Sequence, residues 1–96
     1  MERCCNIANN QIVFTSDNES KFFSYGSFIA SYKWLGSNQK ELTLSNLYDY
    51  SKTTSKYLKI FLNEYCYFYY DNTNELRKMI KKGGYNNVTI KVIDLY

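Results

Sequence analysis

The residue types that most enzymes use for acid–base or nucleophilic chemistry are sparse in this chain of 96 residues. It contains no histidine, which excludes histidine-based catalytic triads and histidine-ligated metal sites. The aspartates and glutamates are scattered, and no two of them fall at a spacing that would pair two carboxylates on one predicted helix. The four glycines form no phosphate-binding loop. We therefore expect a protein without catalytic residues, cofactors or metal ligands.

The three cysteines, Cys4, Cys5 and Cys66, are the remaining candidates for covalent or metal chemistry. They are too few and too unevenly spaced for a disulfide framework. The first residues lack the apolar stretch of a signal peptide, and no apolar run reaches the length of about 18 residues that a membrane-spanning helix needs. We expect reduced thiols, a cytoplasmic protein and no contact with a membrane.

The most unusual feature of the chain is its tyrosine content. Eleven of its residues are tyrosines, and they are densest in the aromatic run at residues 65–70. Surface tyrosines supply rigid contact area for protein interfaces and for stacking on nucleic-acid bases. Alternatively, the rings seal the core while their hydroxyls reach water. We expect one or two of Tyr67, Tyr69 and Tyr70 to be exposed, because an alternating segment cannot bury all three beside Cys66 and Phe68.

A second candidate surface is the basic sequence at residues 77–82, in a predicted short helix. The net charge of +3 comes from residues 51–96, which contain eight basic and four acidic residues. Arg77, Lys78, Lys81 and Lys82 would hold phosphates or an acidic protein surface. Alternatively, they form a solvated helix face whose charge matches the helix dipole. The lysines at 52, 56 and 59 extend this patch only if the two predicted helices lie side by side.

The elements that position these residues follow from hydrophobic patterning. Segments rich in β-branched and aromatic residues predict strands at 11–15, 21–35, 41–45 and 88–95. Gly26 lies in the middle of the longest of them, where a bulge or a close backbone approach is expected. A hairpin loop at 35–39 connects this strand to the next.

Two helices are predicted between the third and fourth strands. Ser51 caps the first, with Thr53 and Thr54 ordering its first turn, and apolar residues then repeat at helical spacing as far as Tyr65. Thr73 or Asn74 caps the second, which ends at the glycine pair 83–84. Residues 1–96 are thus expected to form a single α+β domain of order β-β-β-α-α-β, with an antiparallel sheet of about four strands and both helices on one face.

Two sequence motifs support a family resemblance that covers the middle 40% or so of the chain. One is Ser-Tyr-x-x-x-Ile-Ala at residues 24–30, and the other is Tyr-Ser-x-Thr-Thr-x-Lys at residues 50–56. They resemble motifs of small proteins from bacteriophages and mobile elements of AT-rich bacteria. The residues that match are structural in this interpretation: Ser51 caps a helix, and Tyr25 packs.

The resemblance implies a phage or mobile-element accessory protein that acts by occupying the surface of a host protein. Inhibitors of bacterial defence nucleases, including anti-CRISPR proteins, are similar in size and in lacking catalytic motifs. Many of those inhibitors are acidic mimics of DNA, and the positive charge here departs from that pattern. The expected partner is therefore a CRISPR effector or its nucleoprotein complex, bound by direct contact.

Two alternatives stay open at this point. A small nucleic-acid-binding protein would use the basic helix and stacking tyrosines, and its affinity would fall steeply as salt rises. A homodimer would cover part of the aromatic surface.

Overall fold

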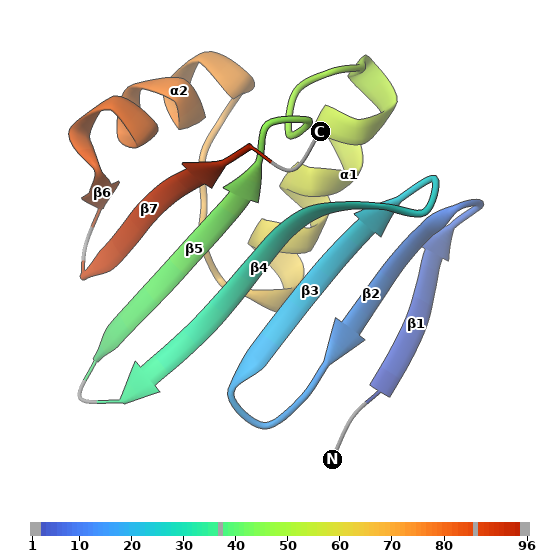
Figure 1. The fold of residues 1–96 in the computed structure, drawn as a ribbon, viewed down its shortest axis with the longest axis horizontal. Helices are drawn as coiled ribbons and strands as arrows, with labels where there is room; N and C mark the ends of the chain where they lie inside the picture. Colours follow the sequence, from blue (N-terminus) through green and yellow to red (C-terminus); the bar gives the residue numbers. More distant parts are fainter. Residues whose placement is uncertain (1–2, 37, 86, 95–96) are drawn as a thin grey trace.

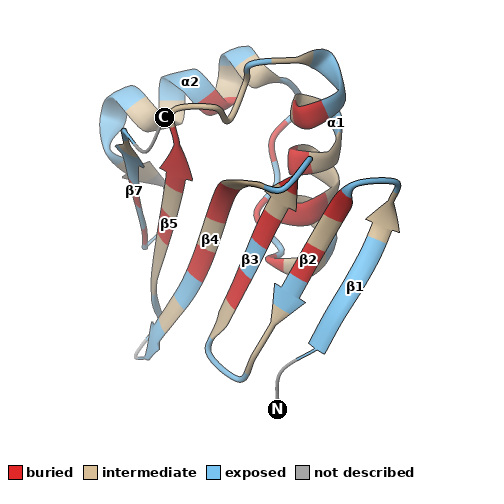
Figure 2. Cartoon of the chain, turned by 45° about the vertical axis from the view of Figure 1, so that its right-hand side comes forward, coloured by how far each residue is buried: buried red, intermediate tan, exposed pale blue. Residues whose placement is uncertain are grey.

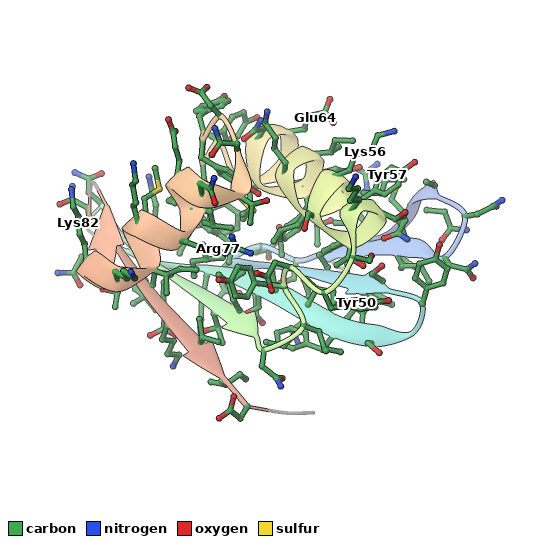
Figure 3. The ribbon with its side chains drawn as sticks, turned by 90° about the horizontal axis from the view of Figure 1, so that it is seen from above. Tyr50, Lys56, Tyr57, Glu64, Arg77 and Lys82 are labelled. Carbon is green, nitrogen blue, oxygen red and sulfur yellow. The ribbon has the colours of Figure 1, made fainter. Side chains whose placement is uncertain are left out.

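The computed structural model describes residues 3–36, 38–85 and 87–94, and these form a two-layer α+β structure. A mixed sheet of seven strands in the order β1-β2-β3-β4-β5-β7-β6 forms one layer. Both helices pack on the same face of this sheet (Figures 1 and 3). The elements in chain order are β1 (Arg3–Ala8), β2 (Gln11–Thr15), β3 (Glu19–Ser24), β4 (Ser27–Gly36), β5 (Gln39–Ser45), α1 (Lys52–Ile60), a π-helix η1 (Phe61–Tyr65), α2 (Thr73–Lys82), β6 (Gly84–Tyr85) and β7 (Val88–Ile93).

The α+β class and the single helical face agree with the sequence prediction, but the sheet is larger than the four strands expected. The strand predicted over 21–35 is wrong, because β3 and β4 are two antiparallel strands joined by a tight turn at Tyr25 and Gly26. Both turn residues have positive φ (51° and 80°), as a type I′ hairpin requires. Tyrosine at a position that usually holds asparagine hides this turn in the sequence. Gly26 therefore belongs to the turn rather than to a bulge.

The prediction of a wholly antiparallel sheet is also wrong at one place. β7 pairs with β5 in parallel, from Lys40 opposite Val88 to Ser45 opposite Ile93. A parallel neighbour must start from the same end of the sheet, so the chain has to return across the sheet before β7 begins. α1, η1 and α2 make up this crossover (Figure 1). The predicted last strand extended to Leu95, which lies outside the described residues.

The core lies between the sheet and this crossover. Figure 2 shows buried residues concentrated on the central strands and on the inner sides of the helices. Phe22 of β3 stacks on Phe61 of η1 with ring centroids 5.6 Å apart, and both side chains are fully buried. Burial of each such side chain contributes roughly 1.5–3 kcal/mol. The other fully or almost fully buried apolar residues of the two layers include Val13, Ile29, Ala30, Tyr32, Leu42, Leu44, Leu58, Leu62 and Leu76.

The ends of the two helices are fixed by side-chain hydrogen bonds. Ser51 is the N-cap of α1, and its Oγ accepts from the backbone N–H of Thr54 at 3.1 Å. Asn72 caps α2 by accepting from Glu75 N–H at 3.0 Å, so the cap lies just before the expected Thr73 or Asn74. Gly83 ends α2 in the left-handed region with φ 80°. Neither helix in the described part of the chain is long and apolar enough to cross a membrane.

The two threonines at the start of α1 have different surroundings. Thr54 is fully buried, and its Oγ1 lies 3.1 Å from Ser24 Oγ and 3.2 Å from Ser51 Oγ. Thr53 is exposed. Thr54 therefore ties the first turn of the helix to β3, which fixes where α1 begins on the sheet.

We predict that Thr54→Val lowers the free energy of unfolding by about 1–3 kcal/mol, because the Ser24 hydroxyl stays buried and loses its partner. Thr53→Val is the matched control and should change it by less than about 0.5 kcal/mol. Urea denaturation of the two variants measures the difference. Equal effects would show that the Ser24–Thr54 hydrogen bond does not hold α1 in place.

Candidate functional site

The aromatic run continues from η1 into a stretch without regular secondary structure, residues 66–70, that we call the tyrosine segment. It lies on the helical side of the sheet and leads from η1 to α2 (Figure 1). Cys66, Phe68 and Tyr70 are buried, whereas Tyr67 and Tyr69 are 73% and 62% exposed. The expectation that one or two of the three tyrosines are exposed is confirmed.

The backbone at Tyr67 is in the left-handed region, with φ 55°. There the chain closes the end of η1, where Phe68 N–H donates to Leu62 C=O at 2.9 Å. Glycine is the usual residue at such a helix end because a side chain adds strain. Tyr67 is nevertheless the most exposed large aromatic or apolar side chain in the described part of the chain. The fold therefore carries a strained tyrosine whose ring contributes little to the core.

The buried half of the tyrosine segment belongs to the core. The Phe68 ring lies 6.3 Å from those of Tyr32 and Tyr70, measured between centroids. Burial raises the pKa of the Cys66 thiol and of the Tyr70 hydroxyl, so both groups are neutral at physiological pH. A nucleophilic cysteine needs a lowered pKa and access to solvent, and Cys66 has neither.

Cys4 and Cys5 lie on β1 and are exposed. Tyr65 Oη donates to Cys5 Sγ at 3.7 Å. In the ranges 3–36, 38–85 and 87–94, no three histidine, cysteine, aspartate or glutamate side chains are grouped so that they could hold a metal ion.

The four basic residues predicted as one patch on α2 are all exposed, but they do not line one site. Arg77 turns toward α1 and forms an ion pair with Asp49 at 2.5 Å. Hydrogen bonds with Asp49 and Tyr48 raise the pKa of Arg77. Lys82 lines a different hollow at the far end of α2, and Figure 3 shows the two residues well apart. Lys78 and Lys81 line neither hollow.

A groove of about 580 Å³ lies between α1 and α2, and we call it the interhelical groove. Helix α1 contributes Lys52, Ser55, Lys56 and Lys59 to its lining, and α2 contributes Thr73 and Arg77. Residues 49–51, Tyr70 and Asn72 complete it. Three lysines thus line the groove from α1, and Arg77, which is paired with Asp49, lines it from α2. No sequence spacing indicates this arrangement, because it depends on how the helices pack.

A further surface that the sequence analysis missed is the sheet face without helices. The rings of Phe14, Phe23 and Phe28 form a row on β2, β3 and β4, with centroid distances of 5.5 Å and 5.7 Å. Phe14 is 42% exposed. Phe14 and Phe23 also line a hollow of about 260 Å³ together with Glu19 and Lys21. Alternation within β2 and β3 is the signal that places these side chains opposite the core.

The chain was compared with known protein families, curated proteins and solved structures. The model of a family of unknown function, DUF8033, matches residues 3–83. No curated protein matches the chain, and no solved structure matches it.

We predict that Tyr67→Gly raises the free energy of unfolding by about 0.5–1 kcal/mol, because glycine adopts positive φ without strain. Tyr69→Gly is the control, since residue 69 is not among the positive-φ positions, and there glycine should lower stability by about 0.5–1 kcal/mol. Urea denaturation distinguishes the two. A loss of stability in both variants would mean that the Tyr67 ring stabilises the fold.

Because a tyrosine hydroxyl and a cysteine thiol are buried in the core, we predict that the protein loses stability at alkaline pH. Desolvation raises the pKa of Tyr32 to about 12, and burial also raises that of Cys66. In the unfolded chain these groups lose protons from about pH 10 and pH 8.5. Above those values the unfolded state binds fewer protons than the folded state, so the free energy of unfolding falls as pH rises.

The urea concentration at the midpoint of unfolding should therefore be constant from about pH 7 to 8.5 and fall at higher pH. Cys66→Ala should move the onset of this fall to about pH 10, where tyrosine ionises. An unchanged onset in this variant would show that the Cys66 thiol is not held neutral by burial.

Proposed function

The chain belongs to this family of unknown function, and we propose that it is a non-enzymatic protein that binds another protein through its tyrosine segment. The observation that carries the proposal is the outward projection of Tyr67 and Tyr69 from a segment whose alternate residues are anchored in the core. Tyrosine has few rotatable bonds, so a fixed ring loses little conformational entropy when it is covered by a partner.

The strain at Tyr67 supports the same proposal. Glycine at this position would relieve it, so the tyrosine is better explained by what its ring contacts outside the molecule. Exposed tyrosines are enriched among the residues that dominate binding energy at protein interfaces.

The proposed partner is a bacterial defence nuclease, such as a CRISPR effector or its nucleoprotein complex, in the host cytoplasm. This part rests on the phage-like motifs at residues 24–30 and 50–56. The non-enzymatic part rests on the absence of histidine from the sequence and on the buried, neutral thiol of Cys66.

The test is affinity capture from a lysate of a bacterial host, with bound proteins identified by mass spectrometry. We predict that the wild-type chain retains a nuclease subunit at near-physiological salt and that Tyr67→Gly combined with Tyr69→Ser loses it. Tyr25→Asn is the matched control, because Tyr25 is also exposed and also has positive φ, in a different part of the molecule. It should bind as the wild type does.

Three outcomes would contradict the proposal. Retention of the partner by the double variant would exclude the tyrosine segment as the interface. Capture of a partner that is not part of a nuclease would exclude the defence role. Recovery of no protein at all would exclude protein binding as the function.

A further inference from the structure

The interhelical groove has a strong imbalance of charge. Lys52, Lys56 and Lys59 line it from α1, and Arg77 lines it from α2. Among the described residues its lining contains a single carboxylate, Asp49, which is paired with Arg77. No acidic residue lies in the first turn of α1 to compete for the lysines there. The uncompensated positive charge therefore lies on the α1 wall, where the three lysines would attract an anion.

The groove also contains hydroxyl groups that suit phosphate oxygens. Ser55 and Thr73 line opposite walls, and Tyr70 lines the space between the helices. Burial keeps the Tyr70 hydroxyl protonated, so it remains a donor rather than a competing anion. Ammonium and hydroxyl donors are the groups that bind the backbone of nucleic acids without regard to sequence.

An exposed aromatic ring accompanies these donors. Tyr50 lines the groove next to the start of α1 and is 52% exposed (Figure 3). Stacking of a base on such a ring is characteristic of proteins that bind single strands, where it operates together with a cationic channel.

From these features we infer that the interhelical groove binds the sugar–phosphate backbone of a single-stranded nucleic acid, with Tyr50 stacking on a base. The available positive charge lies on the α1 wall, and stacking on Tyr50 requires an unpaired base, which a single strand offers and a duplex does not. This site includes neither Tyr67 nor Tyr69, although Tyr70 of the tyrosine segment lines it, and it uses the lysines of α1 rather than the basic end of α2.

The structure offers a matched pair of variants for the test. Lys52 and Lys56 are four residues apart on α1 and line the groove, whereas Lys78 and Lys82 have the same spacing on α2 and lie outside it. All four side chains are exposed, and glutamine is a good helix former, so both double substitutions to glutamine should fold. Each pair removes the same charge, and circular dichroism checks the fold.

Fluorescence anisotropy with labelled single-stranded DNA and RNA of about ten nucleotides then measures binding between about 50 and 200 mM salt. The wild type should bind, more weakly as salt rises. Lys52→Gln with Lys56→Gln should weaken binding about tenfold and make the slope of log K against log salt shallower by about 1.4. Lys78→Gln with Lys82→Gln should change the affinity less than about twofold. Tyr50→Ser should weaken binding about fivefold or more without changing the salt slope.

The inference is overturned by any of three results: no binding by the wild type at the lowest salt, equal losses in the two lysine pairs, or duplex DNA bound as tightly as a single strand. Equal losses would mean that only the net charge attracts the nucleic acid. The combined Tyr67→Gly and Tyr69→Ser variant should bind the oligonucleotide normally, so failure of the protein-binding proposal can be told apart from failure of this one.

Discussion

The parallel pairing of β5 with β7 is the constraint on which the rest of this structure depends. Two parallel neighbours cannot be joined by a short turn, so 42 residues, 46–87, must carry the chain back across the sheet. That return places α1, the tyrosine segment and α2 next to each other on one face. The core, the exposed tyrosines and the interhelical groove all result from this one connection.

Each segment of the crossover contains buried side chains that build the core and exposed side chains that form a surface. In the tyrosine segment, alternate side chains fill the space over the sheet, and those between them project outward. In α1, Leu58 is buried, while Lys56, two residues before it and therefore on another side of the helix, lines the groove. The buried residues fix the backbone on which the exposed ones are presented, which keeps the loss of entropy on binding small.

The parts of the fold that depend on local pattern are the ones the sequence predicts. The apolar repeat after Ser51 places α1, alternation places β5, and the glycine pair at 83–84 ends α2. The turn at Tyr25 is missed because its left-handed backbone is held by hairpin pairing rather than by a typical turn residue. β1 is missed because Arg3-Cys4-Cys5-Asn6 does not alternate and is a strand only through its pairing with β2. The groove is missed because two separate helices form it.

The order of the strands leaves the two borders of the sheet unequal. Within residues 3–36, 38–85 and 87–94, β1 ends one border with six residues that have only β2 beside them, and β6 ends the other with two residues. Backbone donors and acceptors along β1 are thus available to a further strand, while the opposite border is too short to offer a comparable ladder. If two copies pair through β1, neither copy has a second long border to which a third copy could add, and the result is a symmetric dimer. A sheet with two long free borders would instead continue to add copies and form a fibre.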